Sequence, residues 1–207
     1  MDGQYGAIST VTAYLRSISM KKSLGAKTIL YPTPVLVVAT YDNGGKPNAM
    51  TVAWGGICCS VPPCVAVSLR KVTYSYANIV NRNAFTVNVA SQRHVKQVDY
   101  FGIASGKVED KFAATGLTAV RSDLVDAPII AEFPLVLECR LVHTFELGLH
   151  TQFVGEILDV KADIEVLGDD GMPDLAKLLP MMYAPELRTY HAVGGPLGKA
   201  FSIGKTL

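Results

Sequence analysis

The sequence lacks the features that mark several large classes of protein. None of its apolar runs reaches the roughly 18 residues needed to span a bilayer. Its net charge is only +1, so no broad field attracts a nucleic acid or an anionic membrane. A GxGxxG or P-loop sequence is also absent, which disfavours nucleotide binding through those motifs. We therefore expect a cytoplasmic protein without nucleic-acid or membrane partners.

Cysteine is scarce as well. Four cysteines in 207 residues do not suggest the disulfide framework of a small secreted domain. The adjacent Cys58 and Cys59 do not have the CxxC spacing of zinc or iron-sulfur sites, so we expect no metal. We interpret Cys58, Cys59, Cys64 and Cys139 as buried small hydrophobes, with a redox role for Cys58 or Cys59 as the alternative.

What the sequence does contain is a series of short β-branched segments separated by turns. Residues 1–19 read as an N-terminal extension and residues 20–207 as one domain. The strands are predicted at residues 31–41, 47–54, 64–69, 84–89, 135–145 and 151–160, and the helices at residues 73–81, 94–101 and 174–183. Residues 105–115 read as a polar loop with one helical turn. This spacing predicts a mainly β fold with short helices, built as an antiparallel barrel.

The strand at residues 135–145 has a clear alternation of apolar and polar side chains. The face predicted to be buried carries Leu137, Cys139, Leu141, His143 and Phe145, and the face predicted to be exposed carries Glu138, Arg140, Thr144 and Glu146. We accordingly interpret His143 as a core residue whose polar atoms are satisfied.

The richest stretch for chemistry is 47–78, which contains the only tryptophan. Ser68, Arg70, Lys71 and Thr73 bring two hydroxyls and two cations to the point where a strand ends and a helix is predicted to begin. A helix start offers unpaired N–H groups and the positive end of the macrodipole, and Thr73 suits its N-cap. These residues predict a phosphate site, with a solvated basic turn as the alternative.

Several segments together resemble the flavin reductase-like family of FMN-binding split barrels, and within it the flavoredoxin group. The resemblance depends on short sequence motifs that follow one another in a fixed order. They lie at residues 31–34, 43–44 with 47–54, 68–71, 85–89, 150–155, 190–194 and 197–201. Each motif is weak alone, but their order and spacing cover about residues 21–207. The resemblance implies a split β-barrel, with Greek-key connections, that forms a homodimer and binds one noncovalent FMN per subunit.

The resemblance also implies roles for individual residues. The segment with Asn48, Met50, Thr51, Val52, Ala53 and Trp54 would lie along the flavin ring, with the Thr51 hydroxyl at its polar edge and Trp54 as a wall. Ser68, Arg70, Lys71 and Thr73 would hold the phosphate. His150 would lie near the flavin and any nicotinamide, with a surface turn histidine as the alternative, and Tyr190 with His191 would close the pocket from the tail.

Three functions remain open on the sequence. The first is an electron carrier of the flavoredoxin type, which passes electrons to a redox partner protein through tightly bound FMN. The second is an NAD(P)H-dependent flavin or ferric reductase, and the third is a flavin-binding module without turnover. Because flavin carries the redox chemistry itself, no catalytic acid or base is required, and His150 is the one catalytic candidate.

Overall fold

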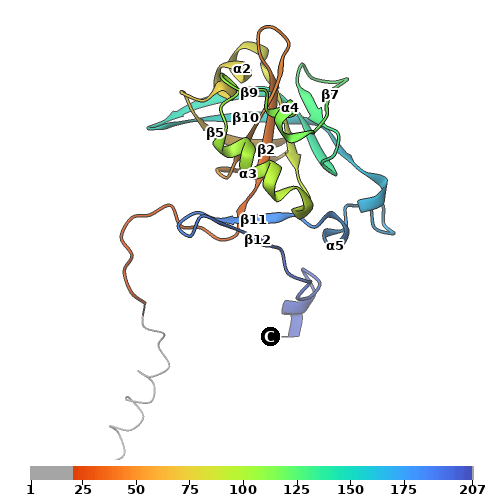
Figure 1. Ribbon diagram of the computed structural model, residues 1–207. Helices are drawn as coiled ribbons and strands as arrows, with labels where there is room; N and C mark the ends of the chain where they lie inside the picture. Colours follow the sequence, from red (N-terminus) through yellow and green to blue (C-terminus); the bar gives the residue numbers. More distant parts are fainter. Residues whose placement is uncertain (1–20, 207) are drawn as a thin grey trace, which may run out of the picture.

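The computed structural model describes residues 21–206, so the predicted extension at residues 1–19 lies outside the described residues. Its main feature is a seven-stranded antiparallel sheet with the strand order β3-β2-β6-β9-β10-β5-β4 (Figure 1). The strands are β2 (Leu36–Tyr41), β3 (Pro47–Val52), β4 (Gly55–Ser60), β5 (Pro63–Arg70), β6 (Ala84–Val89), β9 (Leu135–Leu147) and β10 (His150–Ala162). The prediction of a mainly β fold is confirmed.

The sheet curls so that its two edges come together. The edge strands β3 and β4 follow one another in the chain, and only Ala53 and Trp54 lie between them. Two strands joined by so short a link must lie close in space, so the sheet bends round into a barrel. The Ser68 amide of β5 donates to the Trp54 carbonyl over 2.8 Å, which continues the β4–β5 pairing into the link between the two edge strands. The edges then separate along β3, which leaves the barrel split.

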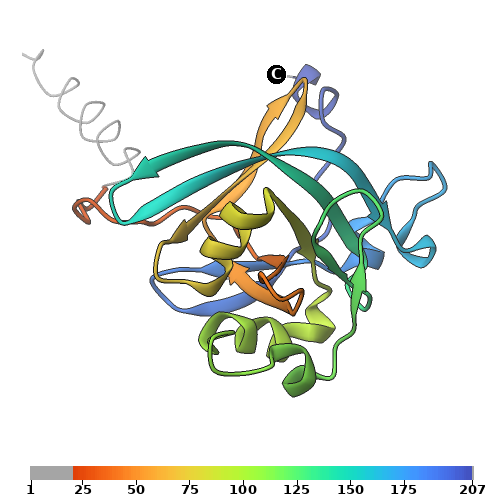
Figure 2. The same ribbon diagram turned by 90° about the horizontal axis from the view of Figure 1, so that it is seen from above.

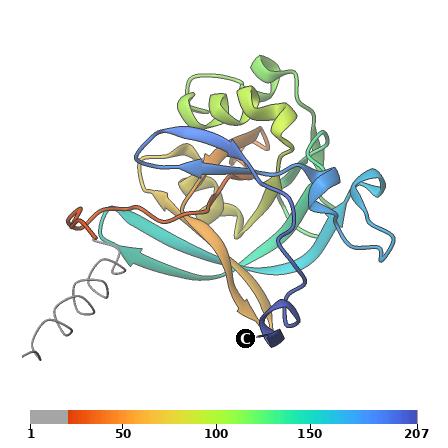
Figure 3. The same ribbon diagram turned by 90° about the horizontal axis from the view of Figure 1, so that it is seen from below.

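Two smaller sheets complete the β structure. One contains β1 (Thr33–Pro34), β11 (Met181–Ala184) and β12 (Thr189–Ala192), and the other is the hairpin of β7 (Ala119–Arg121) and β8 (Pro128–Ile130). Strands β11 and β12 lie at the lower end of the barrel in Figure 1 and in front of it when seen from below (Figure 3). The C-terminal segment therefore covers the end of the barrel opposite α2.

Short helices cover the remaining openings. They are α2 (Tyr74–Arg82), α3 (Val95–Ile103), α4 (Lys111–Thr115) and α5 (Leu175–Leu178), with 3-10 turns at Gln92–His94, Ile164–Val166 and Ile203–Thr206. Helix α2 packs near one mouth of the barrel, and α3 and α4 pack on the outer face of β3 (Figure 2). Within the described part of the chain, no helix is both long and apolar enough to cross a membrane.

Strand β2 separates two hydrophobic cores. Val38 points into the barrel, where it packs with Phe85 and Phe153. Its neighbour Val37 points outward and packs with Phe101, beneath α3 and α4. Because successive strand residues face opposite sides, a continuous apolar strand supplies both cores at once. Strand β3 also packs into both cores through its two faces. This packing fixes the position of the strand that borders the candidate site.

Four of the predicted segments differ from the structure. The helix predicted at residues 174–183 ends at Leu178, because Leu179 adopts a left-handed conformation (φ 52°) and Pro180 cannot continue a helix. Strand β11 follows instead. The region after Trp54, where no strand was predicted, forms β4, and the tail, also without a predicted strand, contains β12. The strand predicted at residues 31–41 is divided between β1 and β2, which belong to different sheets.

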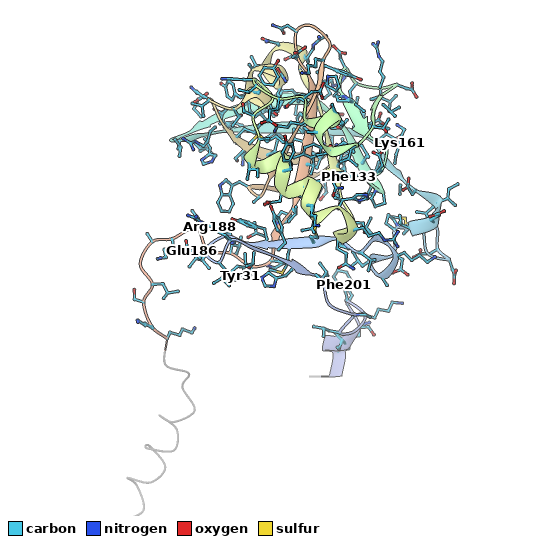
Figure 4. All side chains as sticks on the ribbon, viewed as in Figure 1. Tyr31, Phe133, Lys161, Glu186, Arg188 and Phe201 are labelled. Atoms are coloured by element: carbon cyan, nitrogen blue, oxygen red, sulfur yellow. The ribbon has the colours of Figure 1, made fainter. Side chains whose placement is uncertain are left out.

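The predicted faces of β9 are also partly wrong. Glu138, expected on the exposed face, has 0% exposure and contacts Ser122 and Lys161, whose side chain crosses from β10 (Figure 4). His143, expected in the core, is exposed because the distal half of β9 extends beyond the body of the protein. Alternation in a sequence gives the two faces of a strand but not which neighbour covers each of them.

Candidate functional site

Three cavities follow one another along the free edge of β3. The first, of about 210 Å³, lies by the start of α2; the second, of about 330 Å³, lies between β3 and β11–β12; the third, of about 400 Å³, lies beside Trp54. Gly102 lines the first and second cavities, and Pro34 and Ala53 line the second and third. Together they form an elongated groove, which we call the β3 groove.

The backbone of β3 supplies polar groups to this groove. As an edge strand, β3 has β2 as its one partner among the described strands, and the Ala49 carbonyl points away from β2 to accept from Lys111. In an antiparallel strand the N–H and C=O of alternate residues point the same way, so Thr51 also presents both groups at the free edge. An edge of this kind matches a planar heterocycle that carries both donors and acceptors.

The first cavity is built around the start of α2. Thr73 is the N-cap, as predicted, but its hydroxyl donates to the Arg70 carbonyl over 2.8 Å instead of accepting from the first turn. No side chain caps the helix, and its first turn contains no acidic residue. The N–H groups and the positive end of the helix dipole therefore remain available to an anion in the cavity.

Buried polar side chains line the same cavity. Asn48 is 3% exposed and donates from Nδ2 to the Ser75 hydroxyl over 2.9 Å, whereas its Oδ1 has no partner among the described residues. Lys111 is 4% exposed and donates from Nζ to the carbonyls of Ala49 and Phe101, each over 2.9 Å. Burial lowers the pKa of Lys111 to about 8.

The third cavity combines an aromatic wall with a polar strip. Trp54 lines it together with Ser68 of β5 and Gln152 of β10, which are paired across the two strands. Arg70 and His150 form the next outward-facing pair in this register, because Leu69 between them is buried in the barrel. Ser68, Arg70 and His150 therefore share one outer face.

The second cavity was not expected in this form. Tyr183 and Tyr190 line it with their ring centroids 5.5 Å apart, and the Tyr190 hydroxyl donates to Asp99 over 3.1 Å. Burial, followed by this bond, raises the pKa of Tyr190. Arg188, at the turn between β11 and β12, also lines the cavity (Figure 4). Of the predicted tail pair, Tyr190 thus lies at the groove, while His191 is exposed and contacts Thr189.

The structure brings most of the predicted site residues to the β3 groove and leaves three of them outside it. Those that line it are Asn48, Met50, Thr51, Val52, Ala53, Trp54, Ser68 and Thr73. Ser68 and Thr73 line different cavities, and the Thr51 hydroxyl is already bonded to the Val98 carbonyl. Arg70, Lys71 and His150 do not line these three cavities. Lys71 pairs with Glu146 over 2.8 Å, and this contact raises its pKa.

Sequence reasoning missed the residues that the α3–α4 region contributes. Gly102, Gly106 and Lys111 stand far from the 47–78 stretch. Gly102 directly follows the segment read as a helix, and Gly106 and Lys111 belong to the segment read as a polar loop. A β-carbon on Gly106 would lie 2.0 Å from Asn48 Oδ1, so a glycine is required where the loop crosses this side chain. One feature of the sequence could have pointed to this region: Lys111 stands beside the apolar Phe112 and Ala113 in an otherwise polar loop.

The comparisons with known proteins agree with this fold. A family model described as a flavin reductase like domain matches residues 28–193. The solved structure of flavoredoxin from Desulfovibrio vulgaris (Miyazaki F) is 55% identical, with a TM-score of 0.87 over 90% of this chain and 100% of that one. The flavoredoxin structure from Methanosarcina acetivorans is 31% identical, with a TM-score of 0.85 over 91% of this chain and 99% of that one.

A relative from Aeropyrum pernix, described as an uncharacterized protein, is 30% identical over 77% of this chain. The aligned part spans 60% of that relative's length. The resemblance to the flavoredoxin group found in the sequence is therefore confirmed across most of the chain. Given the matched domain and the split barrel, this protein belongs to the flavin reductase-like family.

Proposed function

We propose that the protein binds one FMN noncovalently in the β3 groove and acts as an electron carrier of the flavoredoxin type. The observation that carries this proposal is the groove itself. At one end it has an uncapped helix start for a phosphate, and at the other an indole, with the free edge of β3 between them. Those three parts suit the three parts of FMN: phosphate, ribityl chain and ring.

Individual residues fit the parts of this cofactor. Asn48 Oδ1 lacks a partner, and a ribityl hydroxyl would supply one. The free N–H and C=O groups of Thr51 suit the donor and acceptor edge of the ring, and Trp54 offers an apolar surface beside it. Thr73, with Arg70 and Lys71 nearby, would stabilise the phosphate.

The bound flavin would supply the electron-transfer chemistry, because its ring accepts and returns one or two electrons. The protein's part is to hold the ring, exclude water from one side and set the potential through hydrogen bonds. The groove is open to solvent along Trp54, Ser68 and Gln152, so a redox partner protein has access to the ring edge at that end. Ser68, Arg70 and His150 would then border the contact.

The alternative, an NAD(P)H-dependent flavin or ferric reductase, is favoured by one observation. Arg188 is exposed at the second cavity and takes part in none of the ion pairs found among residues 21–206. A cation beside two tyrosine rings is suited to a phosphorylated nucleotide, whose base stacks on an aromatic surface. A module that binds flavin without turnover has no comparable feature in its favour.

A titration of the apoprotein tests the binding proposal. Trp54 is the only tryptophan in the sequence, so added FMN should quench the protein's indole fluorescence with a one-to-one endpoint. Denaturation of the complex should then release free FMN, since the binding is noncovalent. Unchanged fluorescence at excess FMN, or flavin that stays on the unfolded chain, contradicts the proposal.

Stopped-flow reduction separates the functions. If the protein is a carrier, NADH and NADPH should reduce the bound flavin slowly, whereas a reduced redox protein should reduce it rapidly. Rapid bleaching by NADPH that is lost in Arg188→Met identifies the reductase instead. Arg93→Met, which removes an exposed arginine outside the groove, serves as the matched control. If no donor reduces the bound flavin, the protein is a flavin-binding module without turnover.

We also propose that the protein is a homodimer. The distal part of the β9–β10 hairpin extends beyond the barrel in two perpendicular views (Figures 1 and 2). It exposes Phe145, Leu147 and Leu149 by 51%, 55% and 65%. Apolar side chains gathered on a projecting hairpin are typical of a surface that packs against a second copy. Light scattering should give twice the chain mass, and Phe145→Glu should give the monomer.

A further inference from the structure

The outer part of the β4–β5 hairpin carries two thiols on facing positions. Cys59 of β4 and Cys64 of β5 are paired directly across the two strands, close to the turn that joins them. Both also pack in a small apolar cluster with Ala66 and Val154. Ala66 lines the third cavity, so this cluster adjoins the β3 groove. The two thiols therefore lie together on the outer face of the barrel, next to the groove.

The spacing of this pair suits a disulfide. Directly opposed residues of an antiparallel ladder have Cα atoms about 4.5 or 5.5 Å apart, depending on the hydrogen-bond pattern. A disulfide requires about 4.4–6.8 Å between the same atoms, so either spacing permits the bond without backbone movement. The register shifts between Ile57 and Cys59 and passes over Cys58, which lines the third cavity. The facing pair is therefore Cys59 and Cys64, and Cys58 stands outside it.

The two thiols differ in their access to solvent. Cys59 is half-buried, and its thiol donates over 3.4 Å to the carbonyl of Val61, an 89% exposed residue of the turn. Cys64 is buried, and burial, followed by the neighbouring Cys59, raises the pKa of its thiol. Thiol–disulfide exchange needs an accessible attacking thiol and a second thiol within reach of the mixed disulfide. Cys59 meets the first requirement and Cys64 the second.

A disulfide at this place would be easy to reverse. It would close a ring over residues 59–64, which strand pairing already holds together. A disulfide stabilises a fold chiefly by restricting the unfolded chain, and a short ring restricts it least. Structural disulfides resist reduction, whereas those that add little stability have higher reduction potentials. The position of the pair thus suits a couple that cycles between thiols and disulfide better than a permanent crosslink.

We propose that Cys59 and Cys64 form a second redox centre, a dithiol whose substrate is a disulfide. The Cys59 thiolate attacks one sulfur of the substrate, breaks its S–S bond and releases one thiol, which leaves a mixed disulfide on Cys59. The Cys64 thiolate then attacks the Cys59 sulfur and releases the second thiol, and the protons of the two cysteines pass to the two released thiolates. The cysteines are oxidised to a disulfide and the substrate is reduced to two thiols. The step uses no flavin, so it goes beyond the proposed function.

Intact-mass spectrometry of the folded protein tests the exchange. The chain is fully reduced, freed of reductant and given an excess of bis(2-hydroxyethyl) disulfide, which is small and uncharged. Cys58→Ser removes the exposed thiol outside the pair and should lose the mass of two hydrogen atoms, with no adduct retained, because the pair closes on itself. Cys58→Ser combined with Cys64→Ser should instead keep one mercaptoethanol adduct on Cys59. Dithiothreitol should restore the starting mass in both.

The wild type keeps the test decisive if a variant does not fold. Its proteolytic peptide with Cys58, Cys59 and Cys64 should carry one adduct, on Cys58, and one internal disulfide between the other two. Adducts on all three cysteines, a disulfide that includes Cys58, or a reaction confined to Cys58 overturns the proposal. So does a Cys58→Ser chain that keeps an adduct. Because no flavin is consumed, these results do not depend on FMN binding, which the fluorescence titration tests separately.

Discussion

Asp42 and Tyr74 connect the β2–β3 turn to the first turn of α2: the Tyr74 hydroxyl donates to Asp42 Oδ2 over 2.7 Å. The other carboxylate oxygen accepts from the amides of Gly44 and Lys46, each over 2.8 Å. The bond to Tyr74, and then the amide of Lys46, lower the pKa of Asp42. One carboxylate thus fixes both a turn and the position of the helix start at the groove.

This contact predicts a stability difference that depends on pH. Tyr74→Phe should lower the free energy of unfolding by about 1 kcal/mol at pH 7, a value reduced because the pair is partly exposed to water. The folded pKa of Asp42 lies below its unfolded value, so the contribution is present above about pH 4 and is lost as the pH falls through the folded pKa. Urea unfolding should therefore separate wild type from variant at pH 7 and not at pH 2. A difference in unfolding free energy between wild type and variant that persists at pH 2 contradicts this prediction.

The buried carboxylate of Glu138 predicts a much larger effect. Lys161→Met removes the cation that neutralises it and leaves Ser122 as its remaining side-chain partner. The expected loss is about 3 kcal/mol, seen as a melting temperature about 6–12 °C lower. Arg140→Met breaks the exposed pair with Glu156 and should cost less than about 1 kcal/mol. Equal losses of unfolding free energy in the two variants would show that Lys161 does not stabilise the buried carboxylate of Glu138.

The cysteines should differ sharply in reactivity. Cys58 is exposed beside Trp54 in the third cavity, although burial raises the pKa of its thiol somewhat. Burial raises the pKa of Cys139 in the barrel to about 12, so almost none of it is thiolate. In native protein at pH 8, N-ethylmaleimide should modify Cys58 first and Cys139 only after unfolding, as mass spectrometry of peptides would show. Early labelling of Cys139 would mean that the barrel opens readily.

Gly106 should be sensitive to the smallest substitution. Gly106→Ala places a β-carbon against Asn48 Oδ1, so either the loop or Asn48 must move. We expect FMN affinity to fall about tenfold, because one interaction of about 1.4 kcal/mol at the first cavity is disturbed. Gly194→Ala, where a β-carbon meets nothing within 4 Å, is the matched control. Equal flavin titration curves for Gly106→Ala and wild type would show that this contact is not needed.

The prediction from sequence succeeded where the signal is local. Alternation and turn residues gave the strands at residues 47–54, 64–69 and 84–89, and a polar residue before an amphipathic run gave α2 with Thr73 as its N-cap. It failed where the outcome depends on distant partners. Strand β4 was not predicted because its two glycines have little intrinsic strand preference, and pairing with β5 is what makes it a strand.

The same division applies to the site. The residues of β3 were identified from one stretch of sequence, whereas Lys111, Gly106 and Arg188 were not, because nothing in their local sequence links them to that stretch. Glu138 was placed on the wrong face for a similar reason, since its burial depends on Lys161, 23 positions away.

By itself, the sequence determined the strands at residues 47–54, 64–69 and 84–89, the start of α2 and the family, since these follow from side-chain order, turn chemistry and motif spacing over short distances. Only the tertiary structure decided how the split leaves the β3 edge free, and which cation reaches the cavity beside it. The physical reason is that both depend on the curl of the sheet, which brings α3 and α4 against β3, and the C-terminal strands to the other side of the second cavity, across long stretches of chain.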